Sequence, residues 1–144
     1  MRKTTTLLIV DDDADDQELF VEAAAEIDPK IHCLCAYNGE EALQMLNTTT
    51  ALPQIIFLDL NMPRMNGRQC LNELHKKNEW VEIPVVIYTT TRRKEDESEL
   101  KNMGAVCFLT KPNSFDGIRK VISLALKKDW NKIETMSLSR VNSQ

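Results

Sequence analysis

The chain lacks the features that would place it in a membrane, outside the cell or around a zinc ion. No apolar run approaches the roughly 20 residues that a membrane span needs, and the apolar stretch 7–10 is too short for a signal peptide core. The four cysteines include no CxxC pair. We therefore expect a cytoplasmic protein with free thiols, in which Cys33 and Cys35 share one strand face as small apolar side chains.

The sequence also has little excess charge. A net charge of −4 over 144 residues argues against nonspecific binding to nucleic acid. Hydrophobic residues make up 42% of the chain, which is ordinary for a globular protein with a real core. We expect one domain over residues 1–128, followed by a helical extension and a polar, loosely ordered C-terminal tail within residues 129–144.

Five short apolar runs alternate with segments of helical periodicity. The runs cover residues 7–10, 31–36, 55–58, 85–88 and 106–109. Helices are expected around residues 19–27, 38–47, 67–77 and 93–102, and from residue 113 past Trp130. This alternation predicts an α/β fold, a doubly wound parallel sheet of five strands with helices on both faces.

Chemically active residues follow four of the five runs. Asp11 and Asp12 follow the first run, Asp59 the third, Thr89 the fourth and Lys111 the fifth. Because parallel strands end along one edge of a sheet, we expect these side chains to converge. Each residue alone has a structural alternative, such as an aspartate that caps the next helix. The set as a whole favours a functional site.

Three carboxylates in one cleft need a counter-charge. Two like charges 4 Å apart repel by about 4 kcal/mol at an effective dielectric constant near 20. Either one carboxyl keeps its proton with a raised pKa, or a divalent cation binds. Because all candidate ligands are oxygens and no calcium-binding loop is present, Mg²⁺ is favoured, with Mn²⁺ as the alternative. A carboxylate beside such a cation and Lys111 is suited to accept a phosphoryl group.

These motifs resemble the receiver domains of two-component response regulators, in particular the single-domain chemotaxis type. The resemblance runs from about residue 7 to 127 and is carried by residues 8–13, 58–63, 65–67, 84–90 and 110–112. It implies a flavodoxin-like fold with strand order 2-1-3-4-5. Residues 79–82, the threonines 89–91 and Trp130 also resemble stand-alone receivers that serve bacterial phytochrome kinases.

The resemblance implies a role for each acidic residue. Asp59 would accept the phosphoryl group from a sensor histidine kinase or a histidine phosphotransfer protein. Asp12, Asp59 and the backbone carbonyl of Asn61 would bind Mg²⁺ directly, and Asp11 would bind it through water. The protein would catalyse only its own phosphorylation and dephosphorylation.

Other positions are implied to hold, time or report the phosphoryl group. Thr89 and Lys111 would bind its oxygens. Phe108 matches an aromatic switch, with core packing as an equally good structural alternative. Asn61 and Thr91 occupy positions that tune phosphate lifetime in the family.

Signalling is expected to occur through protein contacts. Residues 129–144 are too few for a separate output domain, so a downstream protein target would read the surface of the fourth helix, fifth strand and fifth helix. Trp130 motivates the prediction of a homodimer. By the same resemblance, the Lys111–Pro112 bond would be cis.

Two other functions stay open at this point. One is a phosphate-independent adaptor that keeps the fold as a binding platform. The other is a phosphohydrolase with an aspartate nucleophile. Such enzymes commonly carry an acid two residues beyond the nucleophile, and Asn61 stands at that place here.

Overall fold

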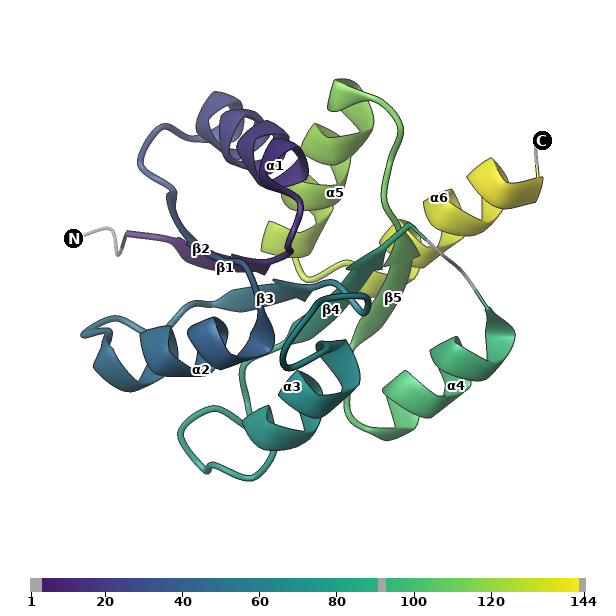
Figure 1. The fold of residues 1–144 in the computed structure, drawn as a ribbon. Helices are drawn as coiled ribbons and strands as arrows, with labels where there is room; N and C mark the ends of the chain where they lie inside the picture. Colours follow the sequence, from purple (N-terminus) through teal and green to yellow (C-terminus); the bar gives the residue numbers. More distant parts are fainter. Residues whose placement is uncertain (1–3, 91–92, 143–144) are drawn as a thin grey trace.

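A computed structural model describes residues 4–90 and 93–142, with the backbone alone for residues 137–142. Five parallel strands form one sheet in the order β2-β1-β3-β4-β5 (Figure 1). The strands are β1 (Thr6–Val10), β2 (His32–Ala36), β3 (Ile55–Leu58), β4 (Val85–Thr89) and β5 (Cys107–Thr110). Both the doubly wound fold and the strand order are confirmed, and each strand lies within one or two residues of its expected position.

The three inner strands are apolar on both sides because both of their faces are covered. Every residue of β1, β3 and β4 is buried. Alternate side chains of β1 enter different cores, with Leu7 and Ile9 in one and Leu8 and Val10 in the other. The continuous apolar runs in the sequence therefore reflect burial from two sides.

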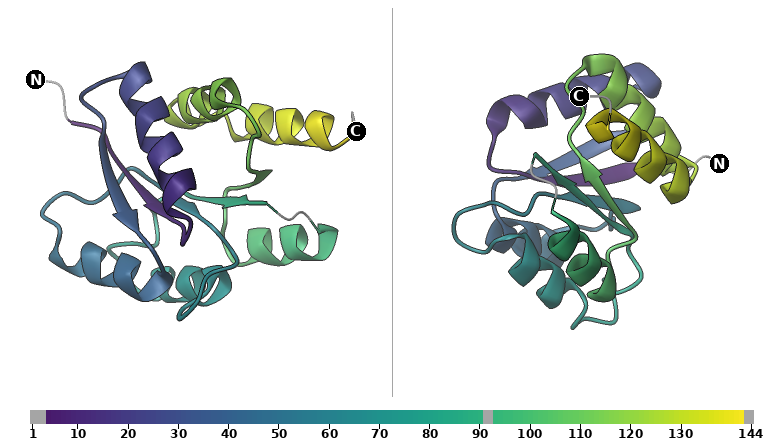
Figure 2. Two further views of the ribbon diagram at one scale, coloured as in Figure 1. Left: turned by 45° about the horizontal axis from the view of Figure 1, so that its top comes forward. Right: turned by 90° about the vertical axis from the view of Figure 1, so that its right-hand side faces the viewer.

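Helices cover the sheet in two layers. The helices are α1 (Ala14–Ile27), α2 (Gly39–Thr48), α3 (Gly67–Leu74), α4 (Lys94–Asn102), α5 (Phe115–Leu126) and α6 (Trp130–Asn142). Figures 1 and 2 show α1 and α5 on one face and α2, α3 and α4 on the other. Helix α6 packs against α5 and β5, which is an edge strand of the sheet.

The expectation of one long helix past Trp130 is wrong. The chain turns at Lys128, whose φ of 59° is left-handed, and α6 begins two residues later. Asp129 starts the new helix, because its carbonyl accepts the N–H of Ile133 and its Oδ1 accepts the N–H of Lys132, each at 3.3 Å. Ile133 is then buried in the core, and Trp130 packs partly against it.

Within the segment expected as a loosely ordered tail, the described residues up to Asn142 form the second half of α6, and residues 143 and 144 lie outside the described residues. This helix continues to Asn142. The described side chains of α6 that pack on the core, Trp130 and Ile133, belong to the first half of the helix. The division of the chain at residue 128 stays a prediction.

Two smaller expectations also need correction. Helix α3 ends at Leu74 rather than near residue 77, because the following residues form turns that bury Trp80. The Lys111–Pro112 bond is trans, the isomer that an X–Pro bond prefers without other constraints.

The cysteines of β2 behave as apolar side chains, as expected. Cys33 and Cys35 are free thiols that pack against the core under α1 and α5. Burial raises the pKa of Cys33 to about 11. Within residues 4–90 and 93–142, no helix combines the length and apolar character that crossing a membrane requires.

Candidate functional site

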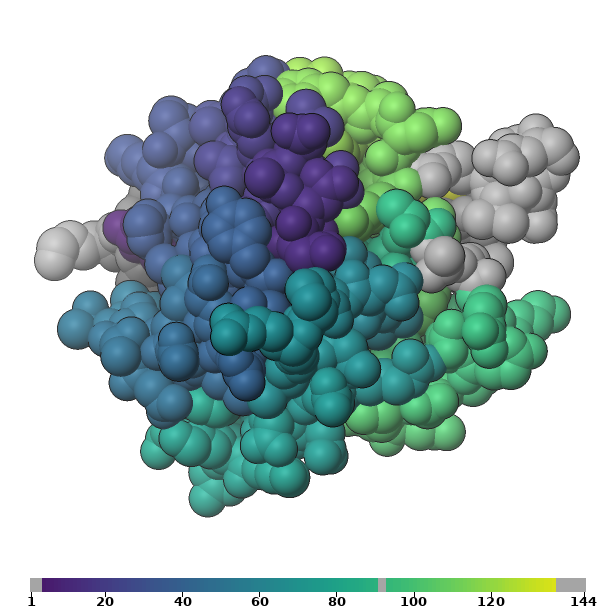
Figure 3. Space-filling model, in the orientation of Figure 1, coloured from purple at the N-terminus to yellow at the C-terminus, as the bar shows by residue number. Residues whose placement is uncertain are grey.

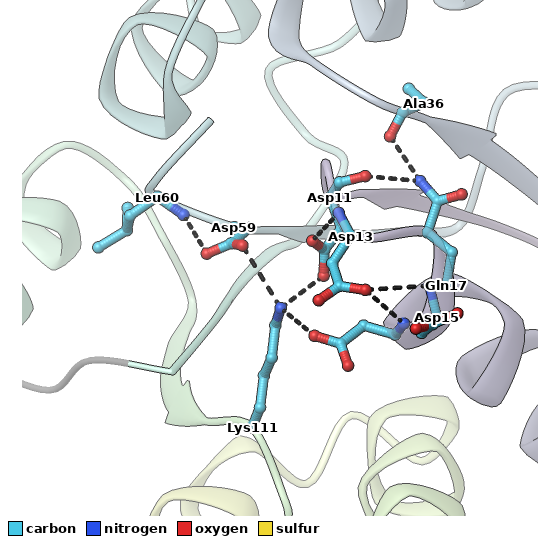
Figure 4. Close-up of polar contacts among 9 residues, drawn as sticks. Asp11, Asp13, Asp15, Gln17, Ala36, Asp59, Leu60 and Lys111 are labelled. Carbon is cyan, nitrogen blue, oxygen red and sulfur yellow. Dashed lines mark hydrogen bonds and ion pairs between the residues drawn. The ribbon is translucent and has the colours of Figure 1, made fainter. Parts of the chain in front are cut away.

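The structure brings the predicted strand-end residues to one edge of the sheet. Asp11 follows β1, Asp59 follows β3 and Lys111 follows β5. Figure 4 shows the Lys111 side chain pointing at the two carboxylates. Its Nζ lies 2.6 Å from Asp11 Oδ2 and 3.4 Å from Asp59 Oδ2. The convergence predicted from the sequence is therefore present for these residues.

The loop after β3 orients Asp59. The N–H of Leu60 donates to Asp59 Oδ1 at 2.8 Å, and the N–H of Gly67 donates to the Leu60 carbonyl at 3.1 Å. A Cβ on Gly67 would lie 2.4 Å from the Asp59 carbonyl oxygen. Only glycine permits this close approach, which starts α3 directly beside the Asp59 backbone.

The loop between β1 and α1 is held by a buried glutamine. Gln17 Nε2 donates to the carbonyls of Asp11 and Ala36, each at 2.8 Å (Figure 4). The Asp11 side chain in turn accepts the N–H of Asp13 at 2.9 Å, and Asp13 caps α1. Gln17 is absent from the sequence-based prediction. Its signal is a polar residue three positions before Phe20, on the apolar stripe of the helix.

Negative charge exceeds positive charge in this site. Asp11 is fully buried, and burial raises its pKa to about 6, because lost hydration opposes its charge more than Lys111 supports it. The charge of Asp59 adds to this increase. Burial alone would lower the pKa of Lys111, but its contacts with Asp11 and Asp16 outweigh that effect and raise it. The Lys111 ammonium therefore stays charged, and the Asp11 carboxyl is the group whose ionisation this environment opposes.

The carboxylates fit a divalent cation. Asp11, Asp12 and Asp59 each offer an oxygen, and these oxygens all lie within 4.8 Å of one another. Asp11 Oδ2 is buried and pairs with Lys111 Nζ at 2.6 Å. Asp12 is exposed at the rim of the site. An all-oxygen donor set of this kind suits Mg²⁺ or Mn²⁺.

The remaining predicted residues differ in their placement. Thr89 ends β4, and its hydroxyl is buried without a hydrogen-bond partner in the described part of the chain. Asn61 is exposed in the loop after Asp59. The Phe108 ring is fully buried in the core under α2, α3 and α4. Thr91 lies outside the described residues. The functional roles expected for these four residues stay predictions.

A further carboxylate, which the sequence does not single out, also contacts Lys111. Asp16 Oδ2 accepts a hydrogen bond from Lys111 Nζ at 2.8 Å. In the sequence, Asp16 has the pattern of an ordinary acidic residue in the first turn of a helix, so it carries no separate signal. Figure 3 shows that α1, in purple, borders the segment after β3, in teal, on this face of the molecule.

Comparisons with known proteins agree with this fold. The family model described as the response regulator receiver domain matches residues 7–123. Response regulator Rcp1 of Synechocystis sp. is 26% identical over 137 residues, which cover 92% of this chain and 91% of Rcp1. The crystal structure of Mn²⁺-bound Rcp1 matches with a TM-score of 0.77, covering 85% of this chain and 94% of that chain at 26% identity.

Two further relatives show the range of proteins that share this domain. The bacteriophytochrome response regulator AtBRR matches with a TM-score of 0.70 at 28% identity, covering 85% of this chain and 92% of that chain. A protein-glutamate methylesterase/protein-glutamine glutaminase of Halalkalibacterium halodurans is 34% identical over 134 residues, or 89% of this chain. The chain spans only 37% of that enzyme's length, and 15% and 57% of two other curated relatives.

Proposed function

Because the chain belongs to the response regulator receiver domain family of two-component signalling, we propose that it accepts a phosphoryl group on Asp59. The observation that carries this proposal is the placement of Asp59 beside one ammonium and two further carboxylates. Lys111 Nζ lies 3.4 Å from Asp59 Oδ2, and oxygens of Asp11, Asp12 and Asp59 lie within 4.8 Å of one another. No simple structural role accounts for this concentration of acid at the end of a buried sheet.

The donor is a phosphohistidine on a sensor histidine kinase or a histidine phosphotransfer protein. A carboxylate oxygen of Asp59 forms the new bond to phosphorus, and the bond between phosphorus and the histidine nitrogen breaks. Its electron pair stays on that nitrogen, and Asp59 becomes an acyl phosphate. Lys111 and the buried hydroxyl of Thr89 bind the oxygens of the transferred group.

Mg²⁺ is the proposed cofactor. Asp12, Asp59 and the backbone carbonyl of Asn61 hold it, with Asp11 acting through water. When bound, this cation neutralises charge on the phosphoryl oxygens. The reported Mn²⁺ complex of Rcp1 supports a divalent ion of this class, and Mn²⁺ is the expected substitute.

A change at Asp59 is read by a downstream protein through α4, β5 and α5. Of the described residues 94–102 in α4, only Leu100 is buried, so few contacts oppose a shift of this helix. Phe108 and Thr89 link the site to this surface. We propose that Asn61 and Thr91 set the lifetime of the phosphoryl group and that Phe108 acts as an aromatic switch. We propose that the protein acts in the cytoplasm without binding nucleic acid or membrane, and that it forms a homodimer.

Intact-mass spectrometry tests the proposal directly. The protein is incubated with acetyl phosphate and Mg²⁺, with matched samples of Asp59→Asn and of wild type in EDTA. We expect a mass gain of one phosphoryl group only in the wild-type sample that contains both acetyl phosphate and Mg²⁺. An unchanged mass in every sample would contradict phosphorylation and favour a phosphate-independent adaptor, whereas phosphorylation of Asp59→Asn would exclude Asp59 as the acceptor.

A further inference from the structure

Lys111 has one carboxylate partner to which the proposed function gives no role. Its Nζ lies 2.8 Å from Asp16 Oδ2, closer than the 3.4 Å to Asp59 Oδ2. Asp16 comes from α1, whereas Asp11 and Asp59 directly follow strands. It does not belong to the group of three carboxylates that fits a cation. Among the described residues, Asp16 therefore contacts the site through the Lys111 ammonium.

The backbone of Asp16 is held firmly in place. Asp13 caps α1 by accepting the N–H groups of Asp15 and Asp16 at 3.0 and 3.2 Å. The next residue, Gln17, anchors the same segment by donating to the carbonyls of Asp11, directly after β1, and Ala36 of β2. The Asp16 carboxylate is thus presented from a fixed position to a lysine 95 residues away in the sequence.

Stabilising the helix dipole does not explain this contact. Asp15 lies in the same first turn, is exposed, and supplies a negative charge at the N-terminus of α1. The Asp16 side chain is only 33% exposed and is directed to Lys111. Two neighbouring aspartates of one turn therefore carry the same charge, but only Asp16 contacts the ammonium among the described residues, which makes Asp15 a control for general charge.

We propose that Asp16 is a positioning residue that competes with the phosphoryl group for Lys111 and so limits phosphorylation of Asp59. This inference rests on the proposed function. An ammonium has three N–H donors, and Asp11, Asp16 and Asp59 together occupy its surroundings in the unphosphorylated protein. A phosphoryl group needs one of these donors. The negative charge of Asp16 also repels the phosphoryl group. Asp16 is not among the three carboxylates that could hold a cation, so a cation there would not neutralise it directly.

Replacement of Asp16 should therefore favour the phosphorylated state. Loss of one partly buried ion pair and one nearby negative charge predicts a change of about fivefold. We expect Asp16→Asn to lower the acetyl phosphate concentration that gives half-maximal phosphorylation by about this factor at fixed Mg²⁺. Asp15→Asn should match the wild type, and Asp16→Glu should restore wild-type behaviour because its carboxylate still reaches Lys111.

The occupancy of Asp59 is measured by intact mass over a series of acetyl phosphate concentrations. Higher occupancy in Asp16→Asn, with wild-type values in Asp15→Asn and Asp16→Glu, supports the competition. Equal effects of Asp15→Asn and Asp16→Asn would show that the loss of any nearby negative charge is sufficient, which would overturn the inference. Unchanged or lower occupancy in Asp16→Asn would also overturn it.

A second measurement tests the contact without any phosphodonor. Trace acetylation of lysines at fixed pH, read by peptide mass, compares Lys111 with the exposed Lys120. Asp16→Asn should increase the relative reactivity of Lys111, and Asp15→Asn should not. An unchanged reactivity in Asp16→Asn overturns the inference.

The two measurements separate this inference from the proposed function. A wild-type protein that gains no phosphoryl group contradicts both, and the acetylation result then reports on the contact alone. A wild-type protein that is phosphorylated normally, with Asp16→Asn indistinguishable from it, contradicts only the role of Asp16.

Discussion

Two lysines of this protein each bind carboxylates from different elements, but in opposite surroundings. The Lys111 side chain is 9% exposed and faces Asp11, Asp16 and Asp59. The Lys101 side chain on α4 is 39% exposed and contacts Glu97 and, on α6, Glu134, whose Oε2 lies 2.6 Å from Lys101 Nζ. Glu134 also accepts the N–H of Phe108 at 3.0 Å.

The difference lies in what each group of charges can do. Around Lys111 the charges are dehydrated and unbalanced, so each one strongly affects its neighbours and attracts a cation or an incoming group. Around Lys101, water screens the charges, and the cluster mainly ties α4, β5 and α6 together. Through Glu134 it also satisfies a backbone donor of the edge strand β5.

The largest effect is expected from removal of the buried lysine. Lys111→Met leaves two buried carboxylates without their cation and should lower the free energy of unfolding by about 3 kcal/mol in EDTA. Lys101→Met should cost less than about 1 kcal/mol because the Lys101 side chain is far more exposed than that of Lys111. Urea unfolding of both variants measures the contrast, and similar losses would show that burial does not separate the two clusters.

Asp11 should give the protein a distinctive dependence on pH. Its folded-state pKa of about 6 lies above the ordinary value of an aspartate, 3.8, so the folded state binds the proton more tightly than the unfolded state does. Stability in EDTA should therefore fall as pH rises from about 4 to about 6, by about 2–3 kcal/mol for this group. Asp11→Asn should lack this decrease. If the free energy of unfolding changed with pH in the same way in Asp11→Asn and in the wild type, the assignment to Asp11 would be wrong.

Mg²⁺ should stabilise the wild-type protein through the same carboxylates. A cation at ten times its dissociation constant contributes about 1.4 kcal/mol to the free energy of unfolding. Asp12→Asn should lose this gain, yet keep wild-type stability in EDTA because Asp12 is exposed. Thermal unfolding with and without Mg²⁺ measures both quantities. An equal shift in the variant would show that Asp12 is not a ligand.

The smallest effect belongs to the exposed cluster. Glu134→Gln removes the charge that faces Lys101 and weakens the bond to the Phe108 N–H, at a cost of about 1 kcal/mol. Hydrogen exchange of the Phe108 amide should become faster. Glu97→Gln is the control, since Glu97 contacts Lys101 only at 3.8 Å. Unchanged exchange in Glu134→Gln would show that this contact does not protect the strand edge.

Local patterns in the sequence predict the strands and the starts of most helices. Runs such as 55–58 are too short for a helix and apolar throughout, so only a doubly covered strand accommodates them. The helices expected from residues 38 and 113 begin beside these positions, where the Asn38 and Ser114 side chains cap them. The helix break at Lys128 was not predicted, because the apolar spacing continues across it through Trp130 to Ile133.

The amino-acid sequence by itself determined the alternating α/β fold and brought Asp11, Asp59 and Lys111 to one edge of the sheet. Parallel strands align their carboxyl ends, so residues that follow them must meet. Only the tertiary structure decided that Asp16 also contacts Lys111, that Gln17 braces the loop, and that Glu134 satisfies the edge of β5. The partners of Asp16 and Glu134 are distant in the chain, and both acids have the character of ordinary helix surfaces, so no local pattern distinguishes them. Gln17 gives only a weak signal, a polar residue on the apolar stripe of its helix.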